Sequence, residues 1–128
     1  VFLFHWKEES QHAILDELEW RREDARLDDA QRDQAVTDLI ALVGDVDHIL
    51  RIQSAADAGY FVRAAGRAFS AAELAAIQDT FLRAYRWQHI ASGVEEPRFT
   101  DVLKALTTQA HMEQIGGALA PILAHVQA

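Results

Sequence analysis

Cysteine is absent from this chain of 128 residues, and proline occurs only twice. Without cysteine the chain cannot form disulfides, ligate an iron–sulfur cluster or use a thiol nucleophile. The absence is typical of proteins in a reducing compartment, and we expect the protein to be cytoplasmic. No apolar run reaches the ~18 residues that a membrane-spanning helix needs, so we expect no membrane partner.

Basic residues are also scarce, with 12 Lys and Arg against 20 Asp and Glu and a formal net charge of −8. This balance argues against nucleic acid as a partner. The sequence also lacks a glycine-rich phosphate loop, a Ser/His/Asp set with familiar spacing, and a basic stripe with interleaved aromatics. Nucleotide-binding, hydrolase and nucleic-acid-binding functions are therefore set aside.

Strong helix formers dominate the rest of the chain, and we predict about four helices and no strands. The first two helices are expected at about 2–25 and 30–65. Asp28 or Asp29 is suited to cap the start of the second helix, and Gly66 is suited to follow its end.

The third helix is expected to begin at a capping box, Ser70 with Glu73, and to end near Gly93. After a loop, Thr100 is expected to cap the fourth helix. That helix should end near Pro121, because proline cannot donate a backbone hydrogen bond.

Short connections between long helices predict antiparallel neighbours, and hence one up-down helical bundle over residues 1–128. The chain begins without Met, in the apolar segment Val1–Phe4. We therefore expect it to be the C-terminal part of a longer protein that has at least one further helix upstream.

Chemistry is indicated by a polar stripe on the first helix. His5, Glu9, His12 and Asp16 are spaced by four, three and four residues, so on a helix they fall within about 60° of one another. Two imidazoles and two carboxylates on one face point to a metal or to a reacting group.

The second and third helices offer partners at the same height. Treating the first two helices as mirror images about their turn places Glu9 level with His48, and His12 level with Asp45. The next turn brings His89 to that level. Imidazole and carboxylate ligands suit iron, manganese or zinc, so these five residues are the predicted metal ligands.

The segment Glu8-Glu9-Ser10-Gln11-His12-Ala13 resembles the metal-binding helix of the ferritin-like superfamily, the di-iron carboxylate proteins. The resemblance implies that Glu9 binds or bridges iron and that His12 binds one iron. It also implies a ferritin-like bundle and a di-iron or mononuclear-iron oxidase or oxygenase that acts on a small molecule. The second Glu-x-x-His of that family is replaced here by Asp45 and His48.

Two other functions stay open. The apolar start and the Gly116-Gly117 helix also suit a non-catalytic bundle with a degenerate metal site, serving as a dimerisation or protein-interaction module. We expect a homodimer whether the protein binds metal or serves as such a module. The remaining alternative is a bundle that binds apolar ligands.

Overall fold

The computed structural model describes residues 2–128, apart from the side chains of Phe2 and Trp6. This part of the chain is helical and contains no strand, which confirms the all-α prediction. No helix within it is both long and apolar enough to cross a membrane. The elements are α1 (Phe2–Asp24), α2 (Asp29–Ala64), α3 (Ala71–Arg86), a π-helix (Trp87–Ala91), α4 (Ser92–Glu95), α5 (Pro97–Leu106) and α6 (Gln109–Gln127).

The predicted start and end of α2 and the predicted start of α3 are confirmed, whereas α3 ends at Arg86 and not near Gly93, because a π-helix and α4 follow it. Asp28 caps α2 in a capping box with Gln31, and Ser70 caps α3 in a capping box with Glu73. Gly66 follows the end of α2 with φ of 65°, a left-handed conformation that favours glycine. Local capping chemistry therefore sets these helix ends.

The prediction that Thr100 caps a single fourth helix is wrong. α5 begins earlier, at Pro97, where the fixed φ of proline suits the first helical position. Glu96 caps it by accepting a hydrogen bond from the backbone N–H of Phe99. A second cap, Thr108, then starts α6 as a separate helix.

The predicted end near Pro121 is also wrong, because α6 continues to Gln127. Pro121 has no N–H to donate to the carbonyl group of Gly117, so one helical hydrogen bond is lost. Ile115 and Ile122, however, are buried on the inner face of α6. Tertiary packing of this apolar face thus outweighs the local preference of proline.

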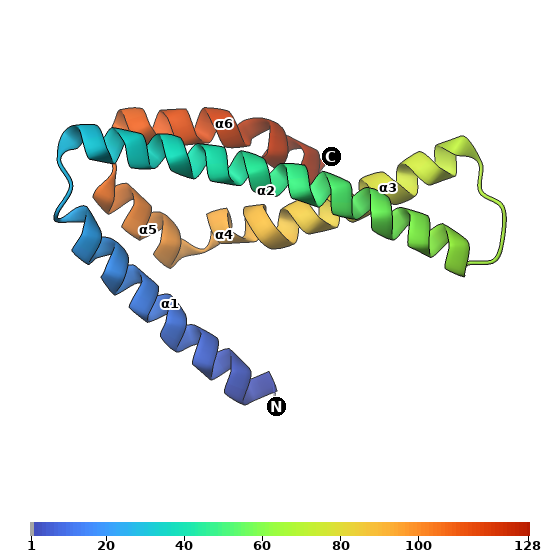
Figure 1. The fold of residues 1–128 in the computed structure, drawn as a ribbon, viewed down its shortest axis with the longest axis horizontal. Helices are drawn as coiled ribbons and strands as arrows, with labels where there is room; N and C mark the ends of the chain where they lie inside the picture. Colours follow the sequence, from blue (N-terminus) through green and yellow to red (C-terminus); the bar gives the residue numbers. More distant parts are fainter. Residues whose placement is uncertain (1) are drawn as a thin grey trace.

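The long helix α2 forms the spine of the molecule (Figure 1). α3 packs against its C-terminal half, and α6 packs against α2, α3 and the π-helix. α1 contacts α5 and otherwise leads away from the body (Figure 1). The structure is thus a helical assembly, and the ferritin-like four-helix bundle stays a prediction.

Two clusters of buried side chains form the core. One contains Val36, Leu103 and Ile115, and the other contains Leu50, Ile90 and Ile122. Leu119 packs against both clusters, which makes α6 the element that joins them. Trp20, near the end of α1, packs against the first cluster and anchors that end of the helix.

A buried ion pair joins α2 to α3. The Nε of Arg86 donates to Oδ1 of Asp47 at 2.6 Å, and its Nη2 donates to Oδ2 at 2.9 Å. Arg51, one turn along α2, donates to the same Oδ2 at 2.9 Å from a more exposed position. Both members of the interhelical pair are buried, so each ion depends on the other for compensation.

Two opposing effects act on the pKa of Asp47. Burial raises the pKa, but the hydrogen bonds from Arg86 and Arg51 together lower it by more. The pKa therefore lies below the usual range for aspartic acid. The carboxylate is therefore the form that the folded protein stabilises.

Removing one partner of this ion pair should be costly. Asp47→Ala should lower the free energy of unfolding by about 3–5 kcal/mol, because it leaves the Arg86 guanidinium buried and unpaired. The Asp47→Leu/Arg86→Met double variant should recover most of that loss. Arg51→Ala, as a control at an exposed partner, should cost no more than about 1 kcal/mol. Urea unfolding measures all four proteins, and a double variant no more stable than Asp47→Ala would contradict this account.

The same carboxylate predicts a pH dependence. Its folded-state pKa is lowered, so its contribution to stability is complete above the unfolded-state pKa of ~3.9 and is lost as pH falls through the folded-state value. The stability difference between the natural protein and Asp47→Asn should therefore be constant from about pH 7 to 5 and shrink below that. Urea unfolding between pH 7 and pH 2 tests this, and a difference that does not change with pH would disprove it.

Candidate functional site

The predicted metal ligands of α1, Glu9 and His12, lie on its exposed surface together with His5. The carboxylate of Glu9 lies between two imidazoles, with one oxygen 3.5 Å from Nδ1 of His12 and the other 3.7 Å from Nε2 of His5. All three side chains are more than half exposed. The helical spacing thus places them as the sequence predicts, but on an uncovered face.

Asp45 and His48 do not meet Glu9 and His12. Both lie on an exposed face of α2, while α1 diverges from α2 after their shared turn (Figure 1). His89 is also exposed and belongs to the π-helix. Across residues 2–128, no group of three or more His, Asp or Glu side chains is arranged to hold a metal ion. The five-residue metal site therefore stays a prediction.

The direction of α1 explains this separation. The argument that placed these residues at the same height assumed that α1 lies antiparallel along α2. The last turns of α1 instead contact α5. Glu17 accepts a hydrogen bond from Arg98, and the ring of Trp20 lies 5.7 Å from that of Phe99. The hydrogen bonds from Arg98 and Arg21 also lower the pKa of Glu17, which keeps it ionised for this contact.

The buried acid on α2 is Asp47, which the sequence analysis did not select. Asp47, Leu50, Ser54 and Ala58 are all buried, and their spacing of three and four residues marks the inner face of α2. Asp45 and His48 fall outside that row. The period of the buried face could have identified Asp47, but not its partner on α3.

Two other histidines hold α6 in place. The Nε2 of His111 lies 2.7 Å from a carboxylate oxygen of Asp33 on α2, and that of His125 lies 2.8 Å from Asp79 on α3. The hydrogen bond from His125 lowers the pKa of Asp79, against the effect of burial, and Arg83 adds to the lowering. These contacts attach both ends of α6 to the neighbouring helices.

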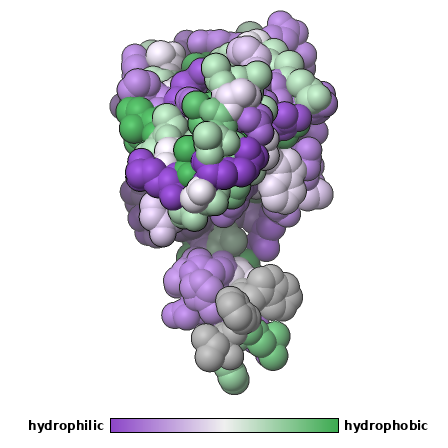
Figure 2. Space-filling view, turned by 90° about the vertical axis from the view of Figure 1, so that its right-hand side faces the viewer, coloured by the Kyte–Doolittle hydropathy of each residue, from purple (hydrophilic) through white to green (hydrophobic). Residues whose placement is uncertain are grey.

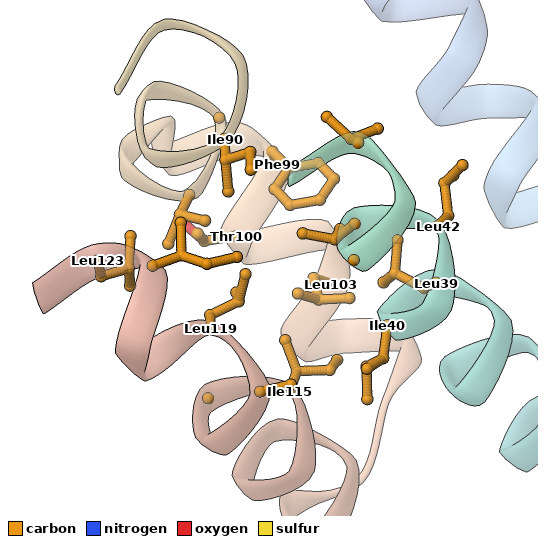
Figure 3. Close-up of a pocket in the computed structure, with 18 of the residues that line it drawn as sticks. Leu39, Ile40, Leu42, Ile90, Phe99, Thr100, Leu103, Ile115, Leu119 and Leu123 are labelled. Carbon is orange, nitrogen blue, oxygen red and sulfur yellow. The ribbon is translucent and has the colours of Figure 1, made fainter. Parts of the chain in front are cut away.

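A cavity of about 500 Å³ lies between α2, α5, α6 and the segment around the π-helix and α4 (Figure 3). Its lining is almost entirely aliphatic or aromatic. The lining side chains and glycines are Leu39, Ile40, Leu42, Val43, Gly44, Val46, His89, Ile90, Gly93, Val94, Phe99, Thr100, Leu103, Met112, Ile115, Gly116, Ala118, Leu119, Ile122 and Leu123.

The lining of this cavity includes three glycines. A Cβ atom added at Gly44, Gly93 or Gly116 would meet no other atom within 4 Å, apart from the local backbone. The three lie on α2, α4 and α6, so each of these walls lacks a side chain at one point. Leu42, at 59% exposure, and Phe99, at 39%, also line the cavity, which is therefore partly open to solvent.

The π-helix helps to form the wall beside α4. The backbone N–H of Ser92 donates to the carbonyl group of Trp87, five residues earlier, in place of the usual four. Ile90, within this segment, is buried and lines the cavity. π-helical turns of this kind occur frequently at functional sites.

The polar groups of the lining are few. The hydroxyl of Thr100 donates to the carbonyl group of Pro97 at 2.9 Å, so it is partly committed to its own helix. The imidazole of His89 is exposed, with its ring 6.3 Å from that of Tyr85. The Tyr85 hydroxyl donates to Asp57, and that hydrogen bond raises the pKa of Tyr85. A bound molecule would therefore contact apolar walls and the imidazole of His89.

This arrangement suits binding better than catalysis. Apolar walls with few polar groups are typical of small-molecule sites, where the polar groups fix the orientation of the ligand. Of the five predicted metal ligands, only His89 lines the cavity. Glycines within apolar stretches of α2 and α6 were the signal for it, but their meeting depends on tertiary packing.

The chain was also compared with known proteins. No protein-family model, curated protein sequence or solved structure matches it.

Proposed function

We propose that this protein binds a small, predominantly apolar molecule in the cavity between α2, α5 and α6. The observation that carries the proposal is a volume of about 500 Å³ lined almost exclusively by apolar residues. Pockets that hold small molecules usually range from about 300 to 1,000 Å³. This is the apolar-ligand function that the sequence left open as an alternative.

The lining also indicates the shape and chemistry of the ligand. Burial of apolar surface would supply the affinity, at about 25 cal/mol per Å² removed from water. The imidazole of His89 can donate to or accept from one polar group, depending on its tautomer. The favoured ligand therefore has a hydrocarbon or aromatic body and a single hydrogen-bonding group at one end.

Two adjacent glycines on α6 offer a matched test of cavity binding. Gly116 lines the cavity and Gly117 does not, yet a Cβ would meet open space at both. With the fluorescent probe N-phenyl-1-naphthylamine, Gly116→Phe should weaken binding at least about tenfold, because its ring occupies the cavity. Gly117→Phe should change the affinity by no more than about twofold.

Fluorescence titration gives the dissociation constant of each variant, and circular dichroism checks that both keep their helix content. Equal weakening by the two substitutions, or no saturable binding by the natural protein, would refute the cavity as a ligand site.

Metal binding is a second candidate function, in the form of the predicted ferritin-like iron protein. The observation in its favour is the position of the Glu9 carboxylate between His5 and His12 on one face of α1. Because imidazole and carboxylate are ligands of iron, manganese and zinc, this face could supply part of a coordination sphere. Further ligands would have to come from outside this face.

Two histidine variants distinguish a metal site on α1 alone from the full five-residue metal site. Elemental mass spectrometry on protein purified without chelators should find roughly one bound metal ion per chain. His12→Ala should abolish it, and His48→Ala should do so only if Asp45, His48 and His89 join the site. A natural protein that takes up neither added iron nor added zinc would eliminate this candidate.

A further inference from the structure

α1 carries a row of uncovered apolar side chains. Leu3, Phe4, Ile14, Leu15 and Leu18 are between 41% and 77% exposed, and we call them the α1 stripe. At about 100° per residue they lie on the side of α1 opposite His5, Glu9 and His12. Figure 2 shows the end of α1 standing clear of the body, with hydrophobic side chains on its surface.

A second uncovered row follows α2. Leu42, Ile49, Ile52 and Tyr60, which we call the α2 stripe, are between 59% and 68% exposed, and Leu42 also lines the cavity. Their helical positions fall within about 80° of one another, on the side away from the buried face of α2. Two long apolar rows on one chain exceed the scattered exposure expected of a monomer surface.

The α1 stripe is held away from the α2 stripe of its own chain. Near the turn, Nε of Arg32 donates to the Asp24 carboxylate at 2.8 Å. Arg98 donates to Glu17, and Trp20 packs on Phe99. These contacts attach the last turns of α1 to the start of α2 and to α5, and α1 then diverges from α2 (Figure 1).

The two stripes carry opposite charges. Lys7 lies among the residues of the α1 stripe, and Asp45 lies among those of the α2 stripe. Within residues 2–128, neither side chain forms an ion pair. Many of the other charged side chains on these helices do, as Arg21 does with Glu17 and Arg51 with Asp47.

We infer that two copies of this chain associate by packing the α1 stripe of each on the α2 stripe of the other. A two-fold axis makes both contacts at once, so each copy buries both of its stripes. Stable interfaces of this type use about 800 Å² from each partner, an area within reach of two long helices per copy. Lys7 of one copy then faces the α2 stripe that contains Asp45 of the other.

Charge reversal tests this arrangement. Sedimentation velocity over a range of concentrations should show the natural chain as a dimer. Lys7→Glu and Asp45→Lys, each alone, should weaken association at least about tenfold, because each places like charges together in both contacts. Lys104→Glu and Asp101→Lys reverse exposed charges on α5 and should leave the dissociation constant unchanged.

Mixing the two single variants separates contacts between copies from contacts within one chain. In a mixed dimer, Glu at position 7 faces Lys at 45, and Lys7 faces Asp45, so both contacts regain opposite charges. The mixture should dimerise about as tightly as the natural chain, and circular dichroism should confirm folded variants. A natural chain that sediments as a monomer would overturn the inference, as would a mixture that associates as weakly as either variant alone. The Lys7→Glu/Asp45→Lys double variant should also dimerise, so a double variant that is folded but monomeric would overturn it too.

Discussion

The buried pair of Asp47 and Arg86 is the interaction on which the rest of the structure depends. It joins the middle of α2 to the last residue of α3, directly before the π-helix begins. The position of Ile90, and with it the second core cluster, follows from where α3 is held. Breaking the pair would therefore disturb the core and the wall of the cavity together, because the same segment serves both.

The walls of the cavity lack a side chain at three points. Gly44, Gly93 and Gly116 lie in its lining, and a Cβ atom at any of them would meet no other atom within 4 Å apart from the local backbone. A larger residue would therefore fit at each position without a clash, and the packing of the protein does not by itself account for glycine there.

Local chemistry made much of the fold predictable from the sequence. Asp28, Ser70 and Gly66 end or begin helices through contacts within a few residues. The candidate site was not predictable in this way. α1 is oriented by Glu17 and Arg98, which are 81 residues apart, and no local pattern reports such a contact. Treating the first two helices as mirror images about their turn did not account for this orientation. The cavity also depends on residues from separate helices.

The π-helix has a consequence for how this chain can change in evolution. It contains one residue more per turn than the α-helix on either side, which is equivalent to a single insertion. Loss of one residue between Trp87 and Ala91 would remove that insertion and restore regular α-helix, with Gly93 and Val94 still in the cavity wall. Exposed residues of the segment, such as Gln88, are therefore the ones whose loss the fold tolerates best.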